Sequence, residues 1–403
     1  MQKSRSNTKW LILILAGLTN AIAGAAPSMS MSVLFYEIST DLHLSLVQVG
    51  LVWGLSSIPA IISMLLGGFI VDRFGPKRIT IIGTILVGIT GALRAVASDF
   101  YSLIFTTLLL GFFTPLIIMG SLKTCRLWFK DDQFGLANGV LSMGMAFGFM
   151  LSSLLSASVL SPWLGGWRNV FLFYGFIAIL FSIPWLFTPE PSPDSDEVNS
   201  NAGKTTFRHS MAHLVKLPNL WLLGIIIFGI GGSIQGTLGY LPLYLRSIGW
   251  EAFQADGALT LFHAVSLIFV LPLSFLSDKL KRRKRILISM SVMIASGIGL
   301  LFVFSGNWVW VAVIIAGFVR DGFMAVFLAM IAETKGVGAI YSGTAIGFVM
   351  IFSGLGNIIA PPSGNLLAYL SPSTPFALWA GFALVGILAI FFLQEEEKPK
   401  VIS

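Results

Sequence analysis

Twelve apolar stretches of about 20 residues each follow one another along this 403-residue chain. An α-helix of that length crosses the hydrocarbon core of a bilayer, which is about 30 Å thick. The predicted spans are 10–34, 46–71, 79–97, 101–125, 136–160, 169–187, 219–245, 255–276, 286–305, 308–331, 341–366 and 373–393. Because these spans take up most of the chain, the sequence predicts an all-α membrane protein with little room for a soluble domain.

Composition and charge support this prediction. The chain is 56% hydrophobic and 11% charged, whereas a soluble domain is roughly 25% charged. If the N-terminus is cytoplasmic, the inside segments carry 21 Lys and Arg residues against 3 outside, namely Arg94, Arg168 and Arg246. The net charge of +7 therefore follows the positive-inside rule rather than indicating nucleic-acid binding. We predict a multi-pass protein of the cell (inner) membrane with both termini in the cytoplasm.

The remaining sequence signals exclude several classes of site. Cys125 is the single cysteine, so no disulfide within the chain is possible. The apolar run from Trp10 to Leu34 is too long for a cleaved signal peptide, and we interpret it as the first span. The polar segments show no nucleophile–base pair, metal-ligand cluster or phosphate-binding loop, so we expect no enzyme, no metal and no cofactor. We also expect a monomer.

A polar, proline-containing segment separates the sixth and seventh spans. We predict an N-terminal six-helix bundle at 1–187, a cytoplasmic linker at 188–218 and a C-terminal six-helix bundle at 219–403. The second part of the linker, from Phe207 to Lys216, is weakly amphipathic and is expected to lie on the membrane surface. We expect its two histidines to be solvated rather than bound to metal.

The two predicted bundles repeat each other. Gly135-Leu-Ala-Asn-Gly139 matches Gly343-Thr-Ala-Ile-Gly347 at an offset of 208 residues, and Asp72 matches Asp278 at an offset of 206. Self-similarity at a fixed spacing indicates duplicated structural units. We therefore predict two parallel six-helix repeats.

The loop after the second span reads Gly68-Phe-Ile-Val-Asp72-Arg73-Phe-Gly75-Pro-Lys77-Arg78. It resembles the signature loop of the major facilitator superfamily, Gly-x-x-x-Asp-Arg-x-Gly-x-Lys/Arg-Lys/Arg. The second copy, which begins at Ser274, keeps the acid and the basic run but lacks both glycines. The resemblance covers the whole chain and implies the twelve-helix fold of that family and secondary transport.

The same resemblance implies a conformational latch between the halves. It assigns that role to Gly68, Asp72, Arg73, Gly75, Arg78 and Asp278. In physical terms, Gly75 permits a tight turn, Gly68 permits close approach of two helices, and Asp72 is suited to capping a helix or pairing with a cation. The alternative is that the basic residues serve only to orient the protein in the membrane.

Glycines recur in spans five and eleven. They are Gly139, Gly144 and Gly148 in span five and Gly343, Gly347, Gly354 and Gly356 in span eleven. Small residues at such spacings let helices pack closely, and the resemblance implies that both spans lie near the moving interface. The Gly-Pro pattern of drug antiporters is absent from span five, which weighs against drug export.

Two adjacent charges, Arg320 and Asp321, lie in the middle of the predicted span 308–331. A full charge near a bilayer centre costs about 3 kcal/mol on insertion scales, so it needs a partner, a cavity or a substrate. Neighbours on a helix are about 100° apart, which predicts that the two charges do not share a face and that each has its own partner. The matching positions of span four are Thr114 and Pro115, so the pair is not repeated.

The chemistry of each charge suggests a role. Arg320 is a permanent, planar donor suited to an anion, and we predict that it binds an anionic substrate. The alternative is a structural ion pair with another span, or with Asp321 across a water. We predict Asp321 as the proton-coupling site, with static pairing to Arg320 or Lys123 as the alternative.

Other polar residues within the spans are candidates for the substrate site. They are Asn20 in span one, Gln235 and Tyr240 in span seven and His263 in span eight. The imidazole of His263 is also suited to proton transfer near neutral pH. The alternative for each is a hydrogen bond that holds two helices together.

These observations favour a secondary active transporter of a small organic or inorganic anion, working by alternating access with proton coupling or exchange. Two alternatives stay open: a proton-coupled exporter of a hydrophobic drug or metabolite, and a non-transporting membrane sensor. More distantly, the span layout and the charged tenth span resemble cyanate and nitroimidazole permeases or monocarboxylate carriers.

Overall fold

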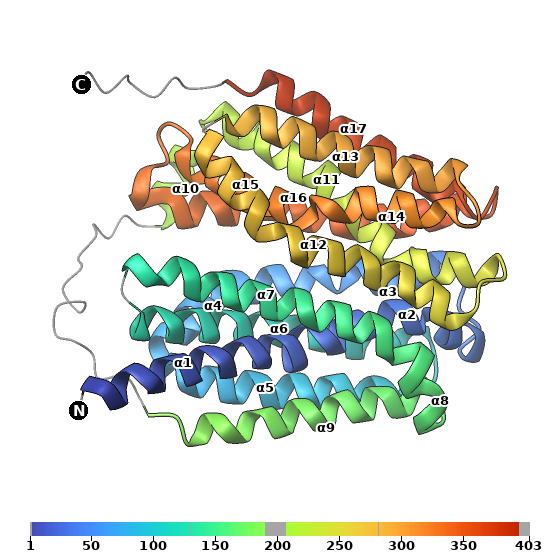
Figure 1. Ribbon diagram of the computed structural model, residues 1–403, viewed down its shortest axis with the longest axis horizontal. Coiled ribbons are helices and arrows are strands. Elements are labelled where there is room, and N and C mark those ends of the chain that lie inside the picture. Colours follow the sequence, from blue (N-terminus) through green and yellow to red (C-terminus); the bar gives the residue numbers. More distant parts are fainter. Residues whose placement is uncertain (1, 130, 190–206, 281, 395–403) are drawn as a thin grey trace.

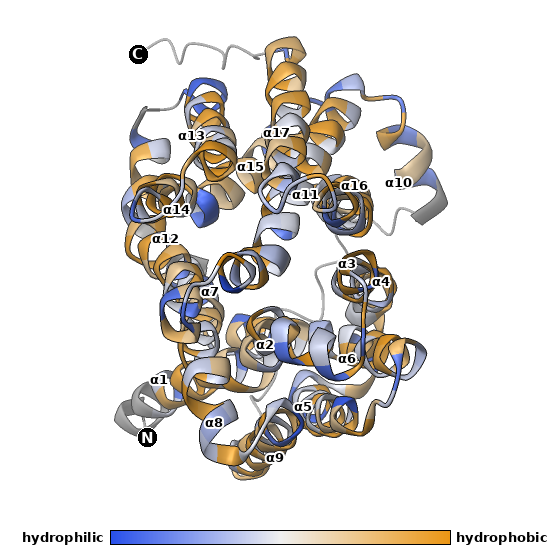
Figure 2. Ribbon diagram, turned by 90° about the vertical axis from the view of Figure 1, so that its right-hand side faces the viewer, coloured by the Kyte–Doolittle hydropathy of each residue, from blue (hydrophilic) through white to orange (hydrophobic). Residues whose placement is uncertain are grey.

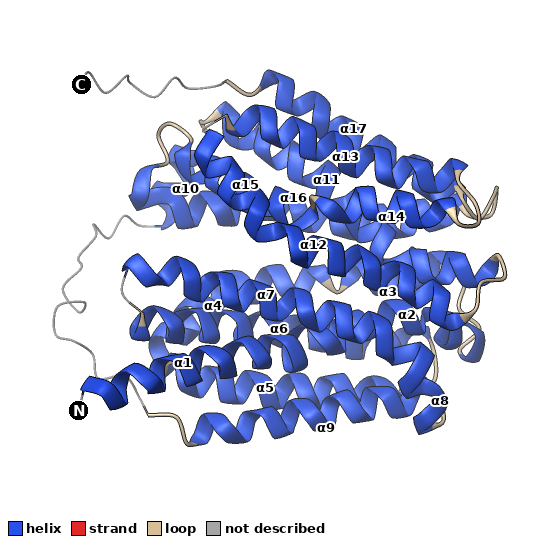
Figure 3. Ribbon diagram, viewed as in Figure 1, coloured by secondary structure: helices blue, strands red, loops and turns tan. Residues whose placement is uncertain are grey.

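The computed structural model describes residues 2–129, 131–189, 207–280 and 282–394, and every regular element in them is helical (Figure 3). The elements of the first half are α1 (Gln2–Thr19), η1 (Asn20–Ala25), α2 (Ala26–Asp41), α3 (Leu46–Leu55), α4 (Ser57–Phe74), α5 (Pro76–Leu93), η2 (Arg94–Val96), α6 (Phe100–Trp128), α7 (Asp131–Leu155), η3 (Ser156–Leu160), α8 (Ser161–Leu164) and α9 (Trp167–Leu186). Those of the second half are α10 (Phe207–Leu214), α11 (Pro218–Ser247), α12 (Ala252–Leu280), α13 (Arg283–Val303), α14 (Trp308–Phe318), α15 (Arg320–Glu333), α16 (Gly338–Leu367) and α17 (Thr374–Phe392).

The described residues contain twelve helices long and apolar enough to cross a membrane, which confirms the predicted number. Several are longer than predicted. The first extends to Asp41 instead of residue 34, and the seventh extends to Ser247. An apolar window ends at the first charged residue, whereas a helix continues as long as its backbone hydrogen bonds can form. Glu37 and Arg246, which lie beyond the predicted windows, are consequently helical.

The helices form two groups, α1–α9 and α10–α17, which lie one above the other in Figure 1. In the first, α5 packs against α6 and α9; in the second, α11 packs against α16 and α17. Both ends of the described chain lie at one end of the molecule, on the left in Figure 1. We call this the terminal end, and the other the opposite end. Figure 2 looks onto the opposite end and shows the two groups with most helices seen along their axes.

The long helices consist largely of hydrophobic residues, which are orange in Figure 2. Large exposed hydrophobic side chains include Phe69, Phe105, Phe176, Phe302 and Leu388. Contiguous apolar surface of this kind is unfavourable in water but suits contact with lipid tails. The protein is a multi-pass integral membrane protein.

Two interruptions of the helices bear on the site. Span one contains a π-helical segment, Asn20–Ala25, between α1 and α2. Such a local widening of the helix often occurs at functional positions. Span ten breaks at Val319, whose φ of −110° and ψ of −3° separate α14 from α15. Both interruptions lie in the middle part of their spans.

The short helix α10, in the part of the linker expected at the membrane surface, packs onto the second group. Leu214 is fully buried, and α10 contacts α16. The Nε2 atom of His213 is 2.8 Å from the carbonyl oxygen of Gly336, and its ring lies 4.9 Å from that of Tyr341. His213 is half-buried, with the carbonyl and the ring on two of its sides, so it is less solvated than we expected. The proline- and acid-rich part of the predicted linker, 190–206, lies outside the described residues.

Candidate functional site

The charged pair of span ten lies at the start of α15, directly after the break at Val319. The Nη1 atom of Arg320 is 2.9 Å from Oδ1 of Asp321. The two side chains are 18% and 24% exposed, so they are neither sealed in the core nor free in solvent. The charges thus form an ion pair in the middle of a membrane helix.

A residue of α12 completes this pair. The hydroxyl of Ser266 donates a hydrogen bond to Oδ2 of Asp321 at 2.7 Å, and the backbone N–H of Asp321 donates to Ser266 Oγ at 3.1 Å. Two glycines bring the helices together: an added Cβ at Gly317 would lie 2.6 Å from the carbonyl oxygen of Phe262, and one at Gly322 would lie 2.9 Å from the side chain of Leu273. Asp321 is held by Arg320 on one oxygen and by Ser266 on the other.

The expectation that Arg320 and Asp321 face apart and need separate partners is wrong. Two features explain the outcome. The pair occupies the first turn of a new helix, and the long arginine side chain can fold back along that turn. Lys123, the other cation considered for Asp321, instead forms an ion pair with Asp72.

The first helix group reaches this pair through Phe149 of α7. The guanidinium carbon of Arg320 is 5.7 Å from the centre of the Phe149 ring, a cation–π distance. The ring of His263 in α12 lies 5.5 Å from the same phenyl ring. His263 is completely buried, and neither ring nitrogen has a hydrogen-bond partner among the described residues. Arg320, Asp321, Ser266, His263 and Phe149 form one cluster, which we call the central cluster.

The other predicted polar residues lie in different surroundings. Asn20 is buried in the π-helix, and neither its amide nitrogen nor its amide oxygen has a hydrogen-bond partner in the described structure. The half-buried Gln235 lies where the two helix groups meet, because its backbone carbonyl accepts a hydrogen bond of 2.8 Å from the indole N–H of Trp53. Each residue therefore has amide atoms that no described contact engages.

Tyr240 is placed differently from these two. Its hydroxyl donates to the backbone carbonyl of Pro372 at 3.1 Å, and its ring centre lies within 6.1 Å of those of Tyr244, Phe376 and Trp379. The side chain is only 2% exposed. In this conformation Tyr240 packs inside the second group, and none of these contacts involves a residue of the central cluster.

The signature loop at the terminal end contains the expected turn. Gly75 has a φ of +86° and joins α4 to α5, a conformation that favours glycine. The tighter contact is at Gly67, where an added Cβ would lie 2.5 Å from Sδ of the Met119 side chain. At Gly68 the same distance to Met119 Cε is 3.8 Å, an ordinary contact, so the close approach expected at Gly68 is not seen in this conformation. The two neighbours point to different faces of α4, and sequence spacing does not show which face meets α6.

The charged residues of that loop do not bridge the groups in this conformation. Asp72 pairs with Lys123 of α6, and the guanidinium of Arg73 lies 5.5 Å from the ring of Phe74. Arg78 is exposed near the start of α5. Asp278 lies in α12, but its side chain is outside the described part of the structure. Their role as a latch stays a prediction.

Close contacts at glycine are found on both α7 and α16. An added Cβ at Gly148 would lie 2.2 Å from the carbonyl oxygen of Ala21, and one at Gly144 would lie 2.3 Å from that of Gly17. On α16, a Cβ at Gly356 would lie 2.3 Å from the carbonyl oxygen of Phe228. Backbones approach this closely only where at least one of the facing residues lacks a side chain. Each of these helices also contacts the other group: α7 packs on α12, and α16 on α3.

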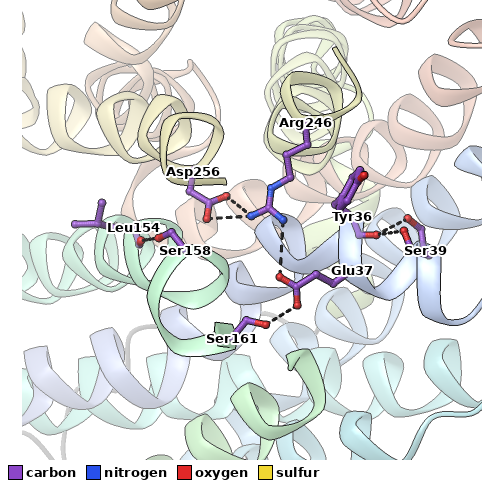
Figure 4. Close-up of polar contacts among 9 residues, drawn as sticks. Tyr36, Glu37, Ser39, Leu154, Ser158, Ser161, Arg246 and Asp256 are labelled. Atoms are coloured by element: carbon purple, nitrogen blue, oxygen red, sulfur yellow. Dashed lines mark hydrogen bonds and ion pairs between the residues drawn. The ribbon is translucent and has the colours of Figure 1, made fainter. Parts of the chain in front are cut away.

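A second charged cluster lies at the opposite end, and sequence reasoning missed it (Figure 4). The Nη2 atom of Arg246 in α11 is 3.2 and 3.3 Å from the two carboxylate oxygens of Asp256 in α12. Its Nη1 atom is 3.8 Å from Oε1 of Glu37 in α2, and the hydroxyl of Ser161 donates to Oε2 of Glu37 at 2.5 Å. We call these residues the end cluster.

The residues of the end cluster are buried rather than exposed in loops. The side chains of Arg246 and Asp256 are 7% and 0% exposed. The charge count places Arg246 in the outside segments together with Arg94, whose side chain is completely buried. One feature of the sequence could have indicated this cluster. Glu37 and Arg246 lie only a few residues beyond apolar runs, so the helices that those runs form can extend to include them.

Other contacts between the groups are also found at the opposite end. Ser32 donates a hydrogen bond to the carbonyl of Leu238, and Asn365 donates to that of Leu46 at 2.9 Å. An added Cβ at Gly50 would lie 2.7 Å from Pro362 Cα. At the terminal end, by contrast, the ion pairs Asp72–Lys123 and Arg283–Glu333 each join residues of one group. In this conformation these polar and close backbone contacts hold the two groups together at the opposite end.

Comparison with known proteins agrees with this architecture. The probable sulfoacetate transporter of Cupriavidus necator is 23% identical over 97% of this chain and 95% of its own length. The 3-(3-hydroxy-phenyl)propionate transporter of Escherichia coli is 26% identical over 94% of this chain and 92% of its own. Among solved structures, nucleoside transporter NupG superimposes with a TM-score of 0.79 at 15% identity, covering 96% of this chain and 100% of that one.

The family match extends over most of the chain. A sequence profile described as Major Facilitator Superfamily matches residues 12–342. Its members move solutes across membranes, so the protein is a transporter and not an enzyme, as the sequence predicted. The chain belongs to the Major Facilitator Superfamily.

Proposed function

We propose that this protein is a proton-coupled transporter of a small organic anion, a carboxylate or sulfonate, and that Arg320 binds the anionic group. The observation that supports this most directly is the ion pair between Arg320 and Asp321 near the middle of span ten. A guanidinium binds a carboxylate or sulfonate through two parallel N–H groups. Sulfoacetate and hydroxyphenylpropionate, named for two relatives, both carry such groups.

Charge balance links the anion to a proton. The central cluster pairs one cation with one carboxylate and is therefore neutral. A bound monoanion would add one negative charge in a region where an unpaired charge is costly. A proton on Asp321 restores neutrality, releases Arg320 for the substrate and leaves Ser266 to hydrogen-bond the protonated acid. One proton per monoanion is the expected stoichiometry.

The remaining residues of the site provide polar and apolar contacts. Gln235 and His263 lie about 17–18 Å along their helices from the opposite end, as Arg320 does, at 1.5 Å per residue. Asn20, Gln235 and His263 offer hydrogen-bonding atoms that no described contact engages, and Phe149 offers a ring beside Arg320. We propose that the first three bind polar groups of the substrate. Tyr240 instead packs α11 against Phe376 and Trp379 of α17.

Alternating access would follow from the way in which the groups meet. We propose that 1–187 and 219–403 move as two bodies joined by 188–218, with both termini in the cytoplasm of the cell, so that this conformation faces inward. In the opposite conformation the signature loop, with Asp72, Arg73 and Arg78, would fasten the terminal end. The bodies would separate where Arg246 now meets Glu37.

Uptake into proteoliposomes tests this function. Radiolabelled sulfoacetate and 3-(3-hydroxyphenyl)propionate should accumulate when the outside is more acidic than the inside. Arg320→Ala should lower uptake about 10- to 100-fold, as expected for the loss of charge-assisted hydrogen bonds worth about 1.5–3 kcal/mol. Arg320→Lys should recover only part of it, because lysine lacks the paired donors.

The matched control is Arg168→Ala, which removes an arginine paired with Asp41 inside the first group and should leave uptake near wild type. Uptake by Arg320→Ala equal to that of wild type would contradict anion binding at this residue. Transport of neutral hydrophobic compounds that is unaffected by Arg320→Ala would favour the exporter alternative.

A further inference from the structure

The end cluster joins the two helix groups through three buried or half-buried charges. Glu37 comes from α2 of the first group, while Arg246 and Asp256 come from α11 and α12 of the second (Figure 4). Asp256 is 0% exposed, Arg246 is 7% exposed and Glu37 is 27% exposed. The two carboxylates therefore share a single cation.

The charges of this cluster do not balance. One guanidinium and two ionised carboxylates carry a net charge of −1, and an unpaired charge away from water is strongly unfavourable. Like charges that share one site resist simultaneous ionisation, so two acids around one arginine hold a proton between them. Asp256 makes the shorter contacts to Arg246, at 3.2 and 3.3 Å, against 3.8 Å for Glu37.

Among the described residues, the groups that contact the end cluster supply no second positive charge. Tyr36 of α2 presents its ring 5.7 Å from the guanidinium carbon of Arg246, and Ser161 of α8 donates a neutral hydroxyl to Glu37. The next cation described nearby along α2, Arg168 of α9, is paired with Asp41. A proton is therefore the remaining way to neutralise the end cluster.

We propose that Glu37 and Asp256 form a proton-binding site, distinct from Asp321, that takes up one proton when the opposite end closes. When the groups part, Glu37 leaves Arg246 and meets water as a free carboxylate, while Arg246 and Asp256 stay together as a neutral pair. The closed state then holds one proton more than the open state. Acid on that side favours closure, by about tenfold in the closed-to-open ratio per pH unit within the titration range.

Distances between spin labels on the two groups test the proposal. Labels at Thr40→Cys and Gln254→Cys, two exposed positions in α2 and α12, report separation of the opposite end in a Cys125→Ser background. Double electron–electron resonance spectroscopy on the purified full chain from pH 5 to 9 measures the distance between the two labels. The fraction of molecules with the longer distance, in which the opposite end is open, should rise as pH increases. Glu37→Gln and Asp256→Asn should each remove most of that pH dependence, because one carboxylate balances Arg246 without a proton.

The control is Asp41→Asn, which removes a carboxylate at the same end that is paired within the first group. It should keep the wild-type pH dependence. Equal pH dependence in Glu37→Gln, Asp256→Asn and wild type would overturn the proposal. A constant short distance at every pH would also overturn it, and intact Arg320-dependent uptake in the same preparation would show that the proposed transport function stands.

Infrared spectroscopy detects the proton itself if a variant fails to close. The carbonyl stretch of a protonated carboxyl should be present in wild type and in Asp41→Asn, and should weaken in Glu37→Gln and Asp256→Asn. To exclude the signal of Asp321, the comparison is made in an Asp321→Asn background. An unchanged band in both variants would rule out a proton in the end cluster.

Discussion

Ser266 and Asp321 exchange two hydrogen bonds: the serine hydroxyl donates to the carboxylate at 2.7 Å, and the backbone N–H of Asp321 donates to the serine oxygen at 3.1 Å. This relationship ties α12 to the first turn of α15 beside the break at Val319. It holds Asp321 through Oδ2, while Nη1 of Arg320 lies 2.9 Å from the other oxygen, Oδ1. In the proposed mechanism, an anion replaces Asp321 as the partner of Arg320 without moving the helix that carries both.

Removing the titratable group of the central cluster should separate binding from energy coupling. In Asp321→Asn, Arg320 is free of its carboxylate, so exchange of internal for external anion should persist. Accumulation driven by a pH gradient should be lost, because the variant has no acid at position 321 to take up the proton. Counterflow and gradient-driven uptake in the same proteoliposomes provide the measurement. Gradient-driven accumulation at the wild-type level would rule out Asp321 as the coupling site.

Loss of the Ser266 hydroxyl should loosen the same ion pair. Ser266→Ala removes one hydrogen bond to a charged group, worth about 1.5–3 kcal/mol, and should shift the pH of half-maximal uptake while leaving the protein folded. Ser289→Ala is the control, since that exposed hydroxyl bonds only to the carbonyl of Arg285 in its own helix. Identical pH profiles for both variants would argue against a functional role for the Ser266 contact.

The contact between α7 and the π-helix should tolerate no side chain at position 148. An added Cβ there would lie 2.2 Å from the carbonyl oxygen of Ala21, so Gly148→Val should destabilise the protein by about 1–3 kcal/mol through overpacking. Gly139→Ala, where nothing lies within 4 Å of the added Cβ, should be neutral or slightly stabilising. Thermal unfolding of the purified variants compares the two. Equal melting temperatures would contradict the close approach.

The hydrogen bond from Trp53 to the carbonyl of Gln235 should favour the conformation fastened at the opposite end. Trp53→Phe keeps a ring but removes a bond worth about 1 kcal/mol, so the closed-to-open ratio should fall about fivefold. Trp185→Phe is matched to it, since that indole donates to Thr19 inside the first group. The label pair at positions 40 and 254 gives the measurement, and a ratio unchanged in Trp53→Phe would show that this bond does not bias the equilibrium.

Much of this protein could be predicted from its sequence. The loop from Gly68 to Arg78 indicated the transporter family. Hydrophobic patterning predicted twelve membrane helices and a charged pair in the tenth span that needs an explanation. These features depend on the length of apolar runs and on the cost of burying charge, which are local properties that sequence displays directly. The turn at Gly75 belongs here too, since only glycine suits its φ of +86°.

Only the tertiary structure decided which charges meet. Pairing depends on helix breaks, on the reach of long side chains and on which faces of distant helices pack together. The break at Val319 lets Arg320 contact its own neighbour, and the extension of α2 and α11 beyond their apolar runs brings Glu37 to Arg246. Glu37 and Asp256 lie far apart in the chain and share the guanidinium of Arg246 because two helix groups close on each other. No spacing rule within one helix contains that information.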